Sequence, residues 1–213
     1  MNLPNRLSLL RICLVPLFIA AYFLPYYWGA FVAVALFVIA AATDFLDGYI
    51  ARKYNLVTDL GKLLDPIADK ILVCAALFCV VATNPLQYLS YLDFTWTANF
   101  GVILLAVGAT IIISRELLIS AVRQIAASKG VVVQANFFGK IKTIFQDISL
   151  PMIVLLNGAK IQAAQATSSI EYNASLFWVT WWWATVTLFV VAVVLTILSG
   201  VIYLKQNKKV FTN

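Results

Sequence analysis

The amino-acid sequence predicts an all-α, polytopic membrane protein with six transmembrane helices. Apolar residues make up 63% of its 213 positions and charged residues only 11%, whereas about a quarter of a soluble domain is charged. The mean hydropathy is +0.94, and no long stretch alternates polar and apolar residues as membrane β-strands do. No repeat or long linker divides the chain, so we expect one domain, residues 1–213.

Each predicted span needs roughly 20 mostly apolar residues, because a helix rises ~1.5 Å per residue. The stretches that meet this requirement are Leu7–Tyr27, Trp28–Arg52, Leu63–Thr83, Ala98–Ser120, Phe137–Leu156 and Ser175–Leu204. Arg11 interrupts the start of the first stretch and no clear cleavage motif follows it. We therefore expect this stretch to be retained as a span rather than removed as a secretory signal.

The distribution of cations predicts that both termini lie in the cytoplasm. Of the 15 lysine and arginine residues, all except Lys160 lie near one side of the spans, and cationic flanks stay on the cytoplasmic side. The six tryptophans fall near the opposite connections, in keeping with their preference for the membrane interface. Topology and attraction to anionic lipids thus explain the net charge of +6, and we expect no nucleic-acid partner.

The residue types available limit the chemistry. The chain has no histidine, and its three cysteines, Cys13, Cys74 and Cys79, each lie in an apolar run. Zinc sites, histidine-dependent triads and a disulfide framework are therefore excluded or disfavoured. Any catalysis must depend on carboxylates, amines and hydroxyls.

Aspartates gather where the second and third spans approach each other. Asp44 and Asp47 share one face of the second span, and Asp65 and Asp69 share one face of the third. Because the connection between these spans is short, the helices are antiparallel neighbours and their acidic faces can meet. About 24 Å of helix rise separates Trp28 from Asp44, which places the cluster just inside the cytoplasmic interface.

Four converging carboxylates need neutralisation, since an unpaired ion costs several kcal/mol to desolvate. Two divalent cations would balance them, and all-oxygen ligation favours Mg²⁺ or Mn²⁺ over zinc. Two such ions at the level of lipid headgroups suit phosphoryl transfer. Helix caps and interfacial charges paired with Arg52, Lys53, Lys62 and Lys70 are the disfavoured alternative, because a cap needs one aspartate per helix end.

The pattern Asp44-x2-Asp47-Gly48-x2-Ala51-Arg52-x8-Gly61-x3-Asp65-x3-Asp69 resembles the signature of the CDP-alcohol phosphotransferase family at all eight fixed positions. The resemblance implies an integral membrane enzyme with a six-helix fold that is often dimeric. It also implies a CDP-linked donor, a hydroxyl acceptor, a divalent metal and release of CMP.

The resemblance also assigns roles to residues. It implies metal ligands at Asp44, Asp47, Asp65 and Asp69, of which Asp69 also serves as general base. It implies CDP contacts at Gly48, Ala51, Arg52 and Gly61. Asn5-x2-Ser8-x2-Arg11 resembles a family element that precedes the first span, so Asn5 and Arg11 are expected near the nucleotide.

The acceptor site is expected at the cytoplasmic ends of the fourth and fifth spans. Residues 1–5, 114–123 and 139–143 resemble bacterial family members that join CDP-diacylglycerol to sn-glycerol 3-phosphate. Cations also gather there, as a phosphorylated acceptor requires, at Arg115, Arg123, Lys140 and Lys142. We prefer Arg115 and Lys140 as phosphate contacts, although the positive-inside rule alone could explain any one cation. Asp147 is a functional candidate without an assigned role, and a pairing with a nearby cation explains it equally well.

We therefore expect transfer of the phosphatidyl group from CDP-diacylglycerol to sn-glycerol 3-phosphate, giving phosphatidylglycerophosphate and CMP. The expected setting is a homodimer in the cell membrane whose active site faces the cytoplasm. Alternatives within the family change the acceptor to serine, inositol phosphate or, as in cardiolipin synthases, phosphatidylglycerol. A cation transporter that binds its ion at the aspartates is the alternative from another class, and it leaves Gly48, Ala51 and Gly61 unexplained.

Overall fold

The apolar stretches form helices. In the hydrocarbon core of a membrane no water can bond to the backbone N–H and C=O groups, and a helix pairs these groups with one another. The computed structural model describes residues 3–54, 59–87, 96–128, 137–165 and 176–206, with the backbone alone for residues 3–5, 44–54, 59–66, 69 and a few positions near helix ends. Within these residues there is no strand. The helices are α1 (Leu3–Tyr22), α2 (Tyr27–Tyr54), α3 (Asp59–Thr83), α4 (Trp96–Ser128), α5 (Phe137–Gln165) and α6 (Leu176–Gln206).

Four segments of the described chain are long and apolar enough to cross a membrane. They are Lys70–Gln87, Asn99–Ala126, Phe137–Gln162 and Phe177–Gln206, and α2 contributes a shorter apolar segment, Tyr27–Thr43. The all-α class and the membrane helices predicted from the sequence are thus confirmed. Crossing of the membrane by α1 and α2 stays a prediction.

Helix boundaries differ from the prediction where turn residues intervene. The sequence placed Tyr27 in the first span, but α1 ends at Tyr22 and Tyr27 begins α2. Pro25 explains the break, because it has no amide hydrogen and biases Leu24 away from the helical region. Asn84 ends α3 in the left-handed region at φ 44°, and its amide donates to the Val80 carbonyl oxygen at 3.0 Å before Pro85 stops the helix.

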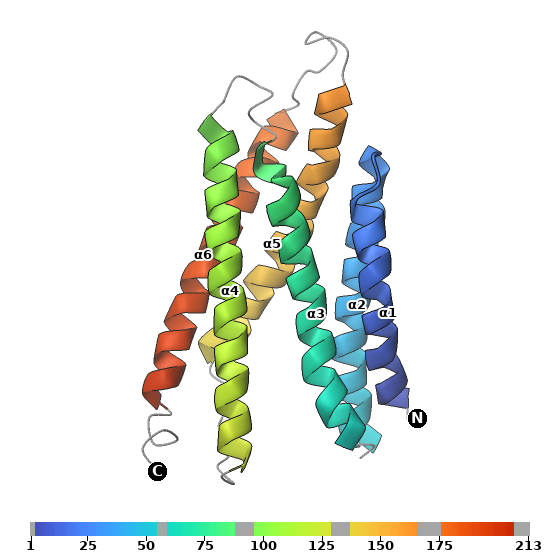
Figure 1. Ribbon diagram of the computed structural model, residues 1–213, viewed down its shortest axis with the longest axis vertical. Helices are drawn as coiled ribbons and strands as arrows, with labels where there is room; N and C mark the ends of the chain where they lie inside the picture. Colours follow the sequence, from blue (N-terminus) through green and yellow to red (C-terminus); the bar gives the residue numbers. More distant parts are fainter. Residues whose placement is uncertain (1–2, 55–58, 88–95, 129–136, 166–175, 207–213) are drawn as a thin grey trace.

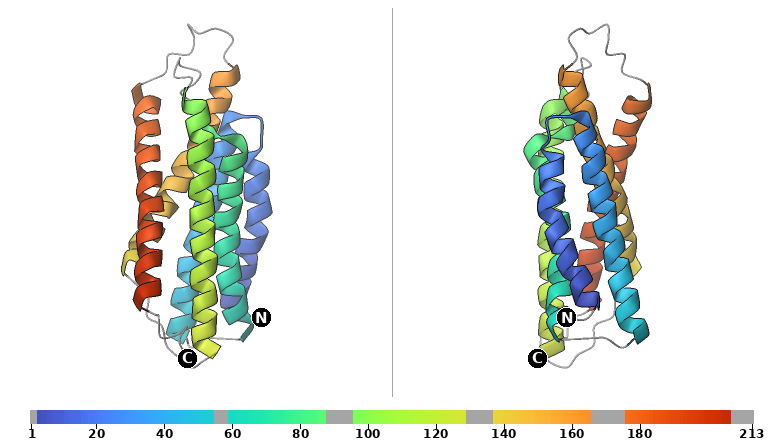
Figure 2. Two further views of the ribbon diagram at one scale, coloured as in Figure 1. Left: turned by 60° about the vertical axis from the view of Figure 1, so that its left-hand side comes forward. Right: turned by 90° about the vertical axis from the view of Figure 1, so that its right-hand side faces the viewer.

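The helices form a ring in which each one packs against the next in the order α1, α2, α5, α6, α4 and α3, with α3 closing on α1. Across the ring, α3 also contacts α5. Figure 1 shows α1 starting and α6 ending at the same end of the bundle, and Figure 2 shows the helices running along its length. We call this the motif end, because α2 ends and α3 begins there.

Large side chains fill the centre of the ring. Phe18 of α1 and Phe37 of α2 are buried with ring centroids 6.1 Å apart, and Trp182 and Phe189 of α6 are buried on the other side. Large apolar residues also face outward on every helix, including Leu17, Phe31, Phe78, Ile103, Ile144 and Ile197. Such an exterior suits contact with lipid rather than water.

Candidate functional site

The aspartate pattern lies on two helix termini that meet at the motif end. Asp44 and Asp47 belong to the last part of α2, and Asp65 and Asp69 belong to the first part of α3. The fold therefore brings both halves of the pattern to the same end of the bundle. Their side chains lie outside the described residues, as do those of the other predicted donor-site positions, Asn5, Gly48, Ala51, Arg52 and Gly61.

Metal ligation at these aspartates stays a prediction. The residues with described side chains contain no group of three or more metal-ligating His, Cys, Asp or Glu. The chemistry of the predicted donor set still fits a hard divalent ion, because it consists of carboxylates alone.

Arg11 lies close to the pattern on the neighbouring helix. Its side chain is 1% exposed, and its Nε donates to the Ala40 carbonyl oxygen of α2 at 3.2 Å. Thr43 Oγ1 donates to the same oxygen at 2.6 Å. Since Ala40 precedes Asp44 by one helical turn, α1 positions a buried cation beside the acidic end of α2.

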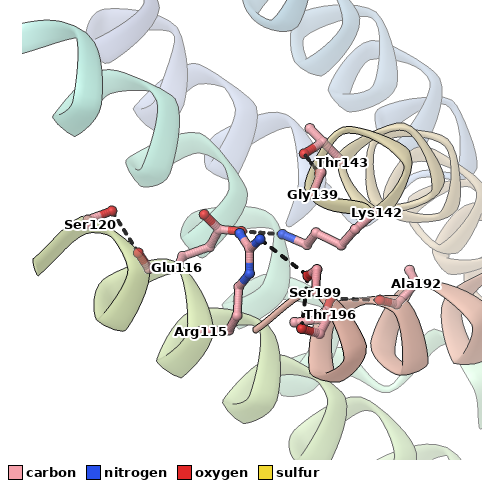
Figure 3. A network of polar contacts seen from close by, with 9 residues as sticks. All are labelled: Arg115, Glu116, Ser120, Gly139, Lys142, Thr143, Ala192, Thr196 and Ser199. Atoms are coloured by element: carbon pink, nitrogen blue, oxygen red, sulfur yellow. Dashed lines mark hydrogen bonds and ion pairs between the residues drawn. The ribbon is translucent and has the colours of Figure 1, made fainter. Parts of the chain in front are cut away.

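A second group of charges joins α4 to α5. Figure 3 shows Glu116 beside Arg115 and Lys142. Lys142 Nζ donates to Glu116 Oε1, and Arg115 Nη1 donates to the same oxygen at 3.2 Å. The Lys142 side chain is 1% exposed and the Glu116 side chain 27%. Lys142 is thus a buried ammonium whose charge is balanced by a carboxylate that still reaches solvent. We call Arg115, Glu116 and Lys142 the α4–α5 charge cluster.

The same cluster reaches α6 through Arg115. Its Nη2 donates to Ser199 Oγ at 3.2 Å, as Figure 3 shows. A side chain on Gly139 would place its Cβ 3.3 Å from Arg115 Nη2, and one on Gly200 would lie 3.4 Å from Arg115 Cγ. A Cβ at Gly139 would therefore crowd the guanidinium group slightly, whereas one at Gly200 would make an ordinary contact.

A cavity of about 70 Å³ opens beside the cluster, between α3, α4 and α5. It exceeds several-fold the space that one water molecule needs. Its polar lining consists of Lys70, Cys74, Glu116, Lys142, Thr143, Gln146 and Asp147. Gln146 is 3% exposed, and its Oε1 has no hydrogen-bond partner among the described residues. A buried carbonyl oxygen without a partner is unfavourable, so the cavity is suited to a polar ligand that carries hydroxyl groups.

The four cations predicted to hold the acceptor do not all lie together. The structure brings Arg115 and Lys142 to Glu116. Lys140 is exposed near the start of α5. Arg123 lies 5.9 Å from the centre of the Tyr203 ring, a cation–π distance, more than a helical turn beyond the cluster.

The sequence assigned no role in acceptor binding to Glu116, Lys70 or Gln146, which line the cavity. Gln146 and Asp147 are consecutive polar residues within an apolar stretch, which is a signal for a functional position in a membrane helix. Asp147 lines the cavity and interacts electrostatically with Lys142.

Comparison with known proteins gives consistent matches. A family model described as CDP-alcohol phosphatidyltransferase matches residues 1–198. A Bacillus subtilis (strain 168) protein named CDP-diacylglycerol--glycerol-3-phosphate 3-phosphatidyltransferase is 42% identical over 73% of this chain and 78% of its own length. An Escherichia coli (strain K12) protein with the same name is 32% identical over 97% of this chain and 95% of its own length.

Another relative carries a different name. A rice protein (Oryza sativa subsp. japonica) named cardiolipin synthase (CMP-forming) is 38% identical over 78% of this chain and 49% of its own length. The relatives therefore do not all carry the same enzyme name.

Proposed function

This chain belongs to the CDP-alcohol phosphatidyltransferase family, and we propose that it transfers the phosphatidyl group of CDP-diacylglycerol to sn-glycerol 3-phosphate. The products are phosphatidylglycerophosphate and CMP. The names of the Bacillus and Escherichia relatives support this reaction. The observation that carries it in this chain is a polar cavity lined by Lys142 and Lys70, and Lys70 is the residue after Asp69 of the motif.

The donor site is proposed at the motif end. Asp44, Asp47, Asp65 and Asp69 would hold two Mg²⁺ or Mn²⁺ ions, which neutralise phosphate oxygens and stabilise the leaving group when bound. Gly48, Ala51, Arg52 and Gly61 would hold the CDP portion together with Asn5. The buried guanidinium of Arg11, held by the Ala40 carbonyl, adds positive charge beside the diphosphate.

The acceptor is proposed to occupy the cavity between α3, α4 and α5. Its phosphate would lie near Arg115 and Lys142, which offer charge-assisted hydrogen bonds, with Lys140 and Arg123 on its approach. Gln146 Oε1 would accept a hydrogen bond from an acceptor hydroxyl. Because Lys70 both lines the cavity and follows Asp69, an acceptor in the cavity lies next to the motif.

Asp69 takes the proton from the attacking hydroxyl. The acceptor oxygen then bonds to the lipid-side phosphorus, and the bond from that phosphorus to the CMP oxygen breaks. This step needs both substrates at the motif end, where the structure places the α2 and α3 halves of the pattern.

The membrane setting is part of the proposal. All six helices cross the cell membrane as a single domain, both termini and the active site face the cytoplasm, and two copies of the chain associate. The alternating direction of the helices and the cation distribution support this topology.

Release of CMP by the purified chain tests the proposed reaction. We expect release from CDP-diacylglycerol only when sn-glycerol 3-phosphate and Mg²⁺ or Mn²⁺ are both present, and loss of release on addition of EDTA. Asp69→Asn should lower the rate at least about 10²-fold, the range of a general base. Asp59→Asn is the matched control, because Asp59 is the first residue of α3 and lies outside the pattern.

The rice relative gives a reason to test a second acceptor. A panel of sn-glycerol 3-phosphate, phosphatidylglycerol, serine and inositol phosphate compares the alternatives under identical conditions. We expect sn-glycerol 3-phosphate to give the highest kcat/KM. A higher value for phosphatidylglycerol would assign this chain the cardiolipin-forming reaction, and ion flux in liposomes without CMP release would favour the transporter.

A further inference from the structure

A second polar site lies at the opposite end of the bundle from the aspartate pattern. A cavity of about 350 Å³ opens there between the α1–α2 connection, the end of α3 and the last part of α5. Its polar lining includes Thr83, Asn157 and Lys160. Lys160 is the one lysine or arginine that the sequence places on this side of the membrane.

A hydrogen-bond network builds this cavity. Lys160 Nζ donates to the Thr83 carbonyl oxygen at the end of α3. The hydroxyls of Tyr22 and Thr83 are 2.5 Å apart, and Asn157 Nδ2 donates to the Tyr22 carbonyl oxygen at 3.4 Å. The ends of α1 and α3 are therefore tied to α5 around the Lys160 ammonium group.

Lys160 keeps capacity for an anion. An ammonium group has three donors, and among the described residues Lys160 uses one of them, on Thr83. The described lining of the cavity contains no carboxylate. The cavity is therefore electropositive at the point where α5 approaches α3.

An apolar groove continues from this cavity along the outside of α1 and α3. The groove has a volume of about 490 Å³ and shares Phe23 and Ala82 with the polar cavity. Its walls include Ile19 of α1 and Ile71, Ala75 and Phe78 of α3. Ile71, Phe78 and Phe23 are exposed, so the groove opens toward lipid.

The groove is about as long as one acyl chain. From Ala82 to Ile71, α3 rises about 16 Å, and one acyl chain extends over about half of a hydrocarbon core of roughly 30 Å. Pro25 lines the polar cavity, and shortly after it Tyr26 and Trp28 form an exposed stack with ring centroids 5.6 Å apart. Exposed aromatic residues of this kind mark the headgroup level.

We propose that the Lys160 cavity and the α1–α3 groove together form a binding site for one anionic phospholipid in the leaflet opposite the aspartate pattern. The headgroup phosphate contacts Lys160 and the rim of the polar cavity, and one acyl chain lies along α3 from Ala82 toward Ile71. The continuity of a cationic cavity with a groove as long as an acyl chain favours a whole lipid over a free anion. This proposal does not depend on the catalytic assignment.

Native mass spectrometry of the purified full chain tests the proposal. Dioleoyl phosphatidylglycerol and dioleoyl phosphatidylcholine, which differ only in the headgroup, are added in equal amounts. We expect the wild type to retain the anionic lipid preferentially, and Lys160→Gln to reduce that preference about fivefold, the effect of one cation near a membrane surface. Lys205→Gln, which removes an exposed lysine from the last turn of α6, should leave it unchanged.

A second pair of variants tests the groove while the Lys160–Thr83 contact stays in place. Ala82→Trp fills the junction of the cavity and the groove and should abolish retention of the anionic lipid. Ala35→Trp places the same side chain at an exposed position of α2 outside both cavities and should preserve retention. Lys160→Arg should also preserve it, which separates loss of charge from loss of folding.

Three results would overturn the proposal. The first is an equal headgroup preference in the wild type and Lys160→Gln, and the second is normal lipid retention in Ala82→Trp. The third is displacement of the lipid by millimolar inorganic phosphate, since this would identify a site for soluble anions.

Discussion

Glu116 connects two cations that the proposed reaction needs. Its Oε1 accepts hydrogen bonds from Lys142 and Arg115, and Lys142 is almost fully buried. A buried ammonium without its carboxylate is strongly destabilising, because its desolvation is no longer offset. Glu116 therefore acts through the cations as a positioning residue, and it need not contact the acceptor itself.

We expect Glu116→Gln to raise the KM for sn-glycerol 3-phosphate about tenfold, equivalent to a loss of about 1.4 kcal/mol, with a smaller change in kcat. The free energy of unfolding of the variant should also fall by about 2–3 kcal/mol. This loss is at or below the usual range for a broken buried ion pair, because Glu116 is partly exposed. Steady-state kinetics and thermal unfolding in detergent measure the two effects.

The double variant Glu116→Gln/Lys142→Gln separates stability from catalysis. It should recover part of the lost stability, because it removes the stranded charge, and it should not recover the KM. A lower KM in Glu116→Gln would contradict the positioning role, since it would mean that the carboxylate competes with the acceptor phosphate.

At the level of helices, α2 and α5 approach closely through small residues. A Cβ on Gly158 of α5 would lie 2.8 Å from the Tyr27 carbonyl oxygen and 2.9 Å from Ala30 Cβ. The first of these atoms belongs to the backbone and cannot rotate away. Small residues at such crossings let membrane helices pack against each other.

Gly158→Ala should therefore be less stable than Gly200→Ala by about 1–3 kcal/mol, the usual effect of overpacking. Gly200 is the matched control, because a Cβ there meets Arg115 Cγ at 3.4 Å, an ordinary contact, and both variants gain the same helix propensity. Thermal unfolding of the two variants in one detergent measures the difference, and equal stability would contradict the close approach of α2 and α5.

Hydropathy predicted the existence of the helices better than their ends. A run of apolar residues predicts a helix because the bilayer leaves few alternatives, but it does not locate a turn such as residues 23–26. Likewise, α5 continues to Gln165 rather than Leu156, since Asn157, Lys160 and Gln165 find partners at the end of the bundle.

The sequence predicted the aspartate pattern of the proposed site better than the cavity between α3, α4 and α5. The aspartate pattern is local, because helical spacing and one short connection determine which residues share a face. The cavity of Glu116, Gln146 and Lys70 depends on α4 and α5 packing beside α3. Nothing in the sequence spacing determines that order of helices, so Arg115 and Lys142 were predicted as acceptor cations, but the cavity that Lys142 shares with these three residues was not.

At the level of the whole molecule, the direction of the helices and the distribution of lysine and arginine residues predict the same membrane topology. The helices alternate so that α2, α4 and α6 end at the motif end, whereas α3 and α5 end at the other. All cations except Lys160 are assigned to the motif end, which should face the cytoplasm.

Alkaline phosphatase fused after Thr83 or Gln165 should therefore be active, and after Ser128 or Gln206 inactive. Green fluorescent protein at the same positions should give the opposite pattern and serves as the control. Active phosphatase after Gln206 would place the aspartate pattern outside the cell, away from cytoplasmic sn-glycerol 3-phosphate, and would contradict both the topology and the proposed reaction.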